Sequence, residues 1–131
     1  MRFREKEQRR QDKLLLEKLF SERLTNELIG IPTLVGFDFL LVNEIIRCEG
    51  LQKCTRVVTT TKTDIISSYN IGEFRKLLEP YHFFSPHKSH LINLAFVKKY
   101  KREGTIILRD NSYIPVSKRK KSEFLNQIIH I

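Results

Sequence analysis

The stretch FFSPHKSHLIN, residues Phe83–Asn93, places apolar side chains on both sides of a polar tip formed by His87, Lys88 and Ser89. Apolar residues on either side of a tip can pack into a core and hold it firmly in place. Loops carried by a rigid sheet commonly present binding side chains to a partner. We therefore expect this tip to be a contact surface.

The sequence around this stretch is typical of strands. From Gly36 onward, short runs rich in Val, Ile, Thr, Phe and Tyr alternate with small polar breaks, which is the composition of a β-meander. Asp110 and Asn111 form the turn of a late hairpin. The fold class is therefore mainly β with short helices, and its predicted strands are Phe37–Val42, Ile45–Glu49, Arg56–Thr60, Asp64–Ser67, Phe83–Ser85, Ala95–Lys101, Thr105–Arg109 and Tyr113–Val116.

Two short helices interrupt the strands. Asn70 and Glu73 have the spacing of a capping box, which predicts a helix through Leu78 that ends near Pro80. Ser117 is a suitable cap for a final helix. The apolar residues of that helix recur at helical spacing, and they are Phe124, Leu125, Ile128 and Ile129.

The N-terminal segment has a different pattern. Arg2–Leu28 contains no Gly or Pro and places Leu16, Phe20, Leu24 and Leu28 four residues apart, which predicts an amphipathic helix. Gly30 and Pro32 are its predicted stop. We divide the chain into a helical linker over residues 1–30 and one domain over residues 31–131. The apolar stripe lacks a sustained heptad, so pairing with a second chain and packing on its own domain both stay open.

The charge of the chain is concentrated in one region. Lys and Arg number 24 against 15 Asp and Glu, which gives a formal net charge of +9. Most of this excess lies between residues 85 and 121, which favours an anionic partner such as nucleic acid or a membrane surface. No stretch is apolar enough to span a membrane, and the charged N-terminus is unlike a secretory signal. We expect a cytoplasmic protein.

Enzymatic chemistry finds little support. The five glycines are isolated and make no nucleotide-binding loop. The four histidines lack the spacing of a metal site. Cys48 and Cys54 are too few for a disulfide framework, and we expect reduced thiols without a chemical role. We therefore expect no enzyme activity, no cofactor and no metal.

Three polar segments are candidate binding loops. Gly50–Arg56 carries two cations, Lys53 and Arg56, together with the hydrogen-bonding Thr55. Phe83–Asn93 carries the tip described above, and its His87 either contacts phosphate or bonds to the local backbone. Pro115–Lys121 contains four successive cations at the start of a predicted helix, which also fits an ordinary solvated surface; they are Lys118, Arg119, Lys120 and Lys121.

Four motifs of the chain together resemble the LytTR family of DNA-binding domains. Phe83–Asn93 is similar to the family signature, Ile114–Arg119 to its closing motif, and Ile45–Gly50 to its opening strand. The helix Asn70–Leu78 lies where the family has a small helix. The resemblance covers about Phe37–Ile128. At position 85 the chain has serine where the family commonly has arginine, a change that removes either a phosphate contact or an internal ion pair.

This resemblance implies a function in bacterial transcription regulation. Such domains are the output part of two-component response regulators of the LytR and AgrA type, and their loops enter successive grooves of direct repeats in promoter DNA. It implies double-stranded DNA as partner, a homodimer on direct repeats as one arrangement, and an upstream receiver or sensor domain that this chain lacks. The implied DNA-binding residues are Lys53, Thr55, Arg56, His87, Lys88, Ser89, Lys118, Arg119, Lys120 and Lys121.

Two other functions remain open from the residues alone. The first is a protein-interaction module, in which the N-terminal helix and exposed strands pair with another chain and the basic surface is incidental. The second is binding of single-stranded RNA. Salt dependence separates nucleic-acid binding from protein interaction, because phosphate contacts release counterions.

Overall fold

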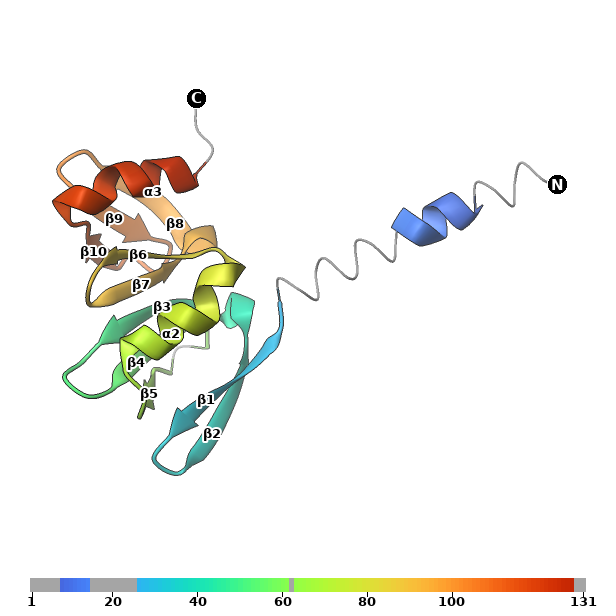
Figure 1. The fold of residues 1–131 in the computed structure, drawn as a ribbon, viewed down its shortest axis with the longest axis horizontal. Helices are drawn as coiled ribbons and strands as arrows, with labels where there is room; N and C mark the ends of the chain where they lie inside the picture. The colour runs from blue at the N-terminus through green and yellow to red at the C-terminus, as the bar shows by residue number, and fades with distance from the viewer. Residues whose placement is uncertain (1–7, 15–25, 62, 129–131) are drawn as a thin grey trace.

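The computed structural model describes residues 8–14, 26–61 and 63–128, and this part of the chain is built mainly of antiparallel strands (Figure 1). The predicted fold class is confirmed. The strands are β1 (Leu28–Thr33), β2 (Gly36–Leu41), β3 (Ile45–Gly50), β4 (Thr55–Thr59), β5 (Ile65–Ser67), β6 (Phe83–His87), β7 (His90–Asn93), β8 (Val97–Lys101), β9 (Thr105–Leu108) and β10 (Tyr113–Pro115). The labelled helices are α2 (Ile71–Leu78) and α3 (Lys121–Gln127), and the short 3₁₀ turns are η1 (Val42–Glu44), η2 (Glu79–Tyr81), η3 (Leu94–Phe96) and η4 (Lys118–Lys120).

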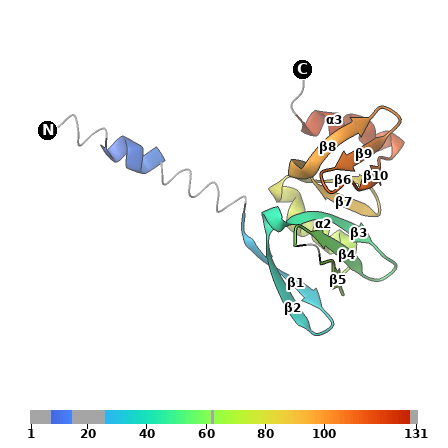
Figure 2. The same ribbon diagram turned by 180° about the vertical axis from the view of Figure 1, so that it is seen from behind.

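The central sheet has five strands in the order β5-β4-β3-β7-β6. The hairpin β1–β2 and helix α2 lie against it on one side, and the three-stranded sheet β10-β9-β8 with helix α3 lies on the other (Figures 1 and 2). Each side has its own apolar core. The first core contains Ile31, Cys48, Val57, Leu78 and Leu91, and the second contains Phe84, Ile92, Ile106, Leu108 and Phe124.

A β-bulge in β3 distributes its side chains between the two cores. The pairing of β3 with β4 shifts between Ile45 and Arg47, where an extra residue is accommodated. Ile46 consequently packs in the second core, whereas Ile45 and Cys48 pack in the first. The central sheet therefore contributes side chains to both cores.

Asn93 fastens the end of β7 to β3. This side chain is 5 % exposed. Its Nδ2 donates to the carbonyl oxygen of Ile45 at 3.0 Å, and its Oδ1 accepts from the backbone N–H of Ala95 at 3.0 Å. A buried amide satisfied on both ends fixes the register of the strand that follows the polar tip.

The structure corrects the predicted end of the N-terminal helix. Residues 8–14 are helical, but Leu28 begins strand β1, and Gly30 and Pro32 lie inside that strand, opposite Phe39 and Phe37. The helical stop at Gly30 and Pro32 is therefore wrong. A Cβ at Gly30 would lie 3.1 Å from the Phe39 ring, so the close ring, not a helix end, accounts for this glycine.

The structure does not test the other parts of the N-terminal prediction. Leu16, Phe20 and Leu24 lie outside the described residues. The division of the chain at residue 30 stays a prediction, although that boundary falls within strand β1.

The two predicted helices have different outcomes. Helix α2 follows Asn70, whose Oδ1 accepts from the backbone N–H of Glu73 at 3.3 Å, so its predicted start is confirmed. Ser117 does not cap the final helix: it is extended, its side chain makes no cap bond, and α3 begins at Lys121 after the turn η4. The backbone N–H of Ser117 instead donates to the carbonyl oxygen of Pro86 at 2.9 Å, which keeps this residue outside the helix.

Candidate nucleic-acid interface

The first two predicted loops lie at the same end of the central sheet. β3 and β7 are neighbours, with Glu49 opposite His90. Beyond that pair, the backbone N–H of Gly50 donates to the carbonyl oxygen of Ser89 at 2.8 Å. The turn between β3 and β4 and the turn between β6 and β7 are thus adjacent, and both point to the left in Figure 1.

The third loop joins the second through its backbone. The 2.9 Å hydrogen bond from Ser117 to Pro86 fixes the start of η4 beside β6, one residue before His87. The backbone bonds therefore link all three loops in series. The rigid central sheet supports the first two loops, and its edge strand β6 supports the third.

Four cations on these loops are exposed to solvent. Lys53, Lys88, Lys118 and Arg119 are exposed, and within residues 8–14, 26–61 and 63–128 their side chains make no ion pair or hydrogen bond. We call these four residues the exposed cation group. Exposed, uncompensated cations on neighbouring loops attract phosphate groups.

The predicted run of four cations at Lys118–Lys121 divides into two pairs. Lys118 and Arg119 are exposed, whereas Lys120 Nζ lies 3.1 Å from Glu123 Oε2 and 5.8 Å from the centre of the Phe84 ring. Lys121 Nζ donates to the carbonyl oxygen of Glu103 at 3.2 Å, at the turn between β8 and β9. Lys120 and Lys121 thus have structural contacts that compete with a ligand.

Thr55 is buried, which argues against the predicted contact of its side chain with DNA. Its side chain has no exposed surface, and its hydroxyl donates to the carbonyl oxygen of Tyr69 at 2.8 Å. Arg56 is partly exposed, but its guanidinium lies 3.6 Å from Glu49 Oε1 and 3.8 Å from Asp64 Oδ2. Two carboxylates near one guanidinium reduce its attraction for an anion.

His87 and Ser89 shape the tip of the second loop. The backbone N–H of Ser89 donates to His87 Nδ1 at 3.2 Å. Of the two roles considered for His87, the structure shows the local backbone bond.

Arg75 on α2 is a residue at the tip that the sequence analysis missed. Its Nε donates to Ser85 Oγ at 2.8 Å, and its Nη2 donates to the carbonyl oxygen of Lys88. It lines a depression between α2, β6 and η4. The other lining residues are Glu79, Ser85, His87, Lys88, Ser117, Arg119 and Lys120. The sequence feature that could have pointed to Arg75 is the serine at position 85, where the resemblance leads one to expect arginine.

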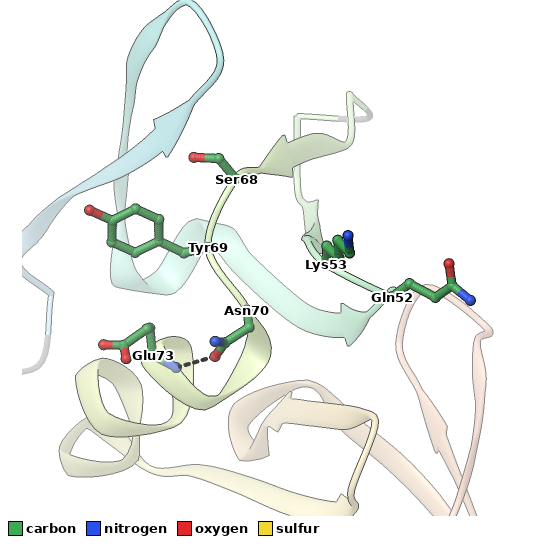
Figure 3. A pocket seen from close by; sticks show the side chains of 6 residues that line it. All are labelled: Gln52, Lys53, Ser68, Tyr69, Asn70 and Glu73. Carbon is green, nitrogen blue, oxygen red and sulfur yellow. Dashed lines mark hydrogen bonds between the residues drawn. The ribbon is translucent and has the colours of Figure 1, made fainter.

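A second depression lies beside the first loop (Figure 3). Gln52 and Lys53 come from the turn between β3 and β4, and the opposite wall is the segment that enters α2. That wall includes Tyr69 and Glu73. Because the Glu73 carboxylate lines the same depression as Lys53, it opposes the binding of an anion there.

The buried Cys48 is a poor nucleophile. Burial raises the pKa of the Cys48 thiol to about 12, against the smaller lowering effect of Arg47, so the reactive thiolate is suppressed. Cys48 and Cys54 are both free thiols.

Among residues 8–14, 26–61 and 63–128, no three His, Cys, Asp or Glu side chains gather in a way that could hold a metal ion. Within those same ranges, no helix has the length and hydropathy needed to cross a membrane.

His90 makes the stability of this end of the sheet depend on pH. Burial lowers the His90 pKa, Glu49 opposes that shift, and His87 and Arg47 add to it. The unfolded chain, with an ordinary histidine pKa near 6.5, therefore binds a proton more readily than the folded chain. The free energy of unfolding should fall as pH drops through about 6.5 and level off, for this residue, below the folded pKa.

Urea unfolding at pH 7.5 and at pH 5.5 measures this effect. We expect His90→Gln to lose less stability between the two pH values than the unsubstituted protein does. His82→Asn, at an exposed position with positive φ, is the control and should keep the original pH dependence. Equal losses in the protein and in His90→Gln would show that His90 is not the group responsible.

The fold and its exposed cations define the class of protein: a small antiparallel β domain that presents charged loops from one end of a rigid sheet. The sequence model of the LytTr DNA-binding domain matches residues 37–129. The chain belongs to the LytTr DNA-binding domain family.

Similar proteins agree with this assignment. The transcriptional regulatory protein YpdB of Escherichia coli K12 is 35 % identical over 95 residues, as is that of Shigella flexneri. The match covers 69 % of this chain but 38 % of either relative, so the chain corresponds to well under half of their length. The LytTr DNA-binding domain of a methyl-accepting/DNA response regulator from Bacillus cereus has the same fold, with a TM-score of 0.64 at 22 % identity over 76 % of this chain and 94 % of that one.

Proposed function

We propose that this chain is the output domain of a bacterial transcription regulator and binds promoter DNA sequence-specifically. The observation that carries the proposal is the exposed cation group, Lys53, Lys88, Lys118 and Arg119, on three loops joined through the end of one sheet. Family membership and the transcriptional regulatory relatives support it. Binding of this kind requires no catalytic step.

Some residues of the three loops would contact bases, and others would contact phosphates. A two-stranded ribbon fits the major groove, where Lys and Arg can donate to guanine O6 and N7. The tip of the β6–β7 hairpin carries Lys88, and η4 carries Lys118 and Arg119. Arg119 has the planar fork that reads guanine with two bonds, whereas Lys88 and Lys118 lack it, so DNA shape should contribute more at their positions.

The larger assembly follows from the same proposal. Each copy would occupy one of two direct repeats, and two copies would meet as a homodimer on the site. The relatives extend well beyond the matched region, and we propose that a receiver or sensor domain upstream controls this chain as part of a two-component system. Residues before β1 would then form the connection.

Salt dependence tests the proposal and the place of Lys53 in it. The protein is used to select duplexes from a random pool, and affinity for the selected duplex is measured over a range of salt concentrations. We expect a steep fall, with a log-log slope of about −0.9 for each phosphate contacted. Lys53→Ala should weaken selected and random duplexes alike and reduce the magnitude of the slope by about one.

Lys98→Ala is the matched control, because Lys98 lies on β8 and donates to Asn111 Oδ1 at 3.2 Å, away from the three loops. Its slope should equal that of the unsubstituted protein. Failure to enrich any duplex would contradict the proposed function. An unchanged slope for Lys53→Ala would remove only the first loop from the interface.

Contact with another protein chain is a second candidate function, favoured by the hairpin β1–β2. Phe37 and Phe39 are exposed and lie with ring centres 6.4 Å apart, and Leu34 and Val35 at the turn are 94 % and 98 % exposed. Exposed apolar patches on soluble domains commonly mark interaction surfaces. Sedimentation of the Phe37→Ser, Phe39→Ser variant tests this role: self-association that is unaffected by the change would contradict it.

A further inference from the structure

We propose that the depression between α2, β6 and η4 is a binding site for one phosphate group, and that Arg75 is the residue that builds it. The inference rests on the proposed function for the source of the phosphate, which we assign to the backbone of the bound duplex. Arg75 lies outside the three predicted loops and reaches the second of them from a helix.

The hydrogen bonds of Arg75 leave most of its donors available. A guanidinium has five N–H groups in a planar fork. One binds Ser85 Oγ and one binds the carbonyl oxygen of Lys88, so three remain. In the part of the chain that the structure describes, Arg75 has no carboxylate within ion-pair distance. Its charge is held in place by neutral partners and is not compensated.

Ser85 completes one wall of the site. Its oxygen accepts from Arg75 Nε at 2.8 Å, so the serine proton is free to donate to an anion. A longer side chain at position 85 would occupy the space that the guanidinium now takes. Serine at position 85 and arginine at position 75 therefore fit together as one arrangement.

The remaining lining residues give the depression a positive charge. Lys88 and Arg119 both line it and are exposed, and neither has a side-chain partner within the described ranges. Lys120 also lines it but lies against Glu123. Glu79 is the one acid among the described lining residues, and three uncompensated cations outweigh it.

The position of the site identifies DNA as the source of the phosphate. The depression lies between the tip that carries Lys88 and the turn that carries Arg119, both of which we assign to the duplex. A backbone strand that passes between two inserted loops brings its phosphates against the surface between them. Arginine, serine and lysine are suitable donors for such positioning contacts.

Salt-dependent binding by the full chain tests the inference. Arg75→Gln should weaken selected and random duplexes alike, about tenfold, and reduce the magnitude of the salt slope by about one. Arg75→Lys keeps the charge and should restore the slope, but only part of the affinity, because it lacks the fork. Lys76→Gln, at the next position of α2 and 80 % exposed, is the control and should change neither quantity.

A second measurement separates a phosphate contact from a merely structural role. Ser85→Ala removes the hydroxyl that faces the anion but leaves the bond from Arg75 to Lys88. It should lower affinity for both duplexes while the backbone amide shifts of Ser89 and Gly50 stay unchanged. Loss of affinity in Arg75→Gln with an unchanged salt slope, or full affinity in Ser85→Ala, would overturn the site.

Titration with inorganic phosphate alone identifies the source. Amide shifts at residues 85–89 and 117–119 that saturate only at high millimolar phosphate support the DNA backbone as the ligand, whereas saturation at micromolar phosphate would overturn that assignment in favour of free phosphate. A different result would contradict the proposed function itself, namely that the unsubstituted protein selects no duplex. If the protein binds DNA and Arg75→Gln behaves like Lys76→Gln, the inference alone fails.

Discussion

Replacing Lys88 and Arg119 together by alanine should lower affinity for the selected duplex by about 2 to 6 kcal/mol, because a well-placed contact to a base contributes about 1 to 3 kcal/mol. Both side chains are exposed and without partners among the described residues, so their removal leaves no buried group unsatisfied. Fluorescence anisotropy with selected and random duplexes at one salt concentration measures the effect. The loss on random duplexes should be much smaller.

Single variants show which members of the exposed cation group contact bases. Lys88→Ala and Lys118→Ala should each cost about 1 to 3 kcal/mol on the selected duplex if they read bases. The pair Lys98→Ala and Lys99→Ala, both exposed on β8, removes the same charge elsewhere and is the control. If the Lys88, Arg119 double variant lost equal affinity on selected and random duplexes, these two side chains would contact phosphates and not bases.

Phe124→Ala should lower the free energy of unfolding by about 3 to 5 kcal/mol, as expected for a large buried ring removed from a core. Phe124 has no exposed surface, and its ring centre lies 5.8 Å from that of Phe84 and 5.2 Å from that of Tyr100. It therefore joins α3 to both β6 and β8. Urea unfolding followed by circular dichroism measures the loss.

The neighbouring Leu125→Ala is the control for this core. Leu125 is 37 % exposed, so its truncation should cost much less. Because α3 directly follows η4, Phe124→Ala should also weaken DNA binding by loosening the third loop. A loss in Phe124→Ala no larger than that in Leu125→Ala would show that the second core does not depend on this ring.

Local signals made much of the fold predictable. The start of α2 depends on Asn70 and Glu73, three residues apart, and the last hairpin on Asn111, which adopts positive φ. Strand β1 escaped prediction because Leu28 continued a helical spacing of apolar residues. Contacts with residues distant in the sequence hold β1 as a strand. Leu28 pairs with Leu41, and the Pro32 carbonyl accepts from Ser67 Oγ at 2.8 Å.

The candidate site follows the same division between local and distant contacts. The order of the three loops was visible in the sequence, and even the Lys120–Glu123 pair has a helical spacing that could have been recognised. The burial of Thr55 could not, because its hydroxyl partner is Tyr69, fourteen residues away. Arg75 reaches Ser85 and Lys88 across the gap between a helix and a strand, which no local pattern describes.

Backbone amide shifts during titration with the selected duplex show directly whether the three loops form the DNA interface. We expect the largest changes at residues 51–54, 87–89 and 117–120, while the β1–β2 hairpin and β8 change little. Large changes centred on the hairpin or on β8, with the three loops unaffected, would contradict this expectation.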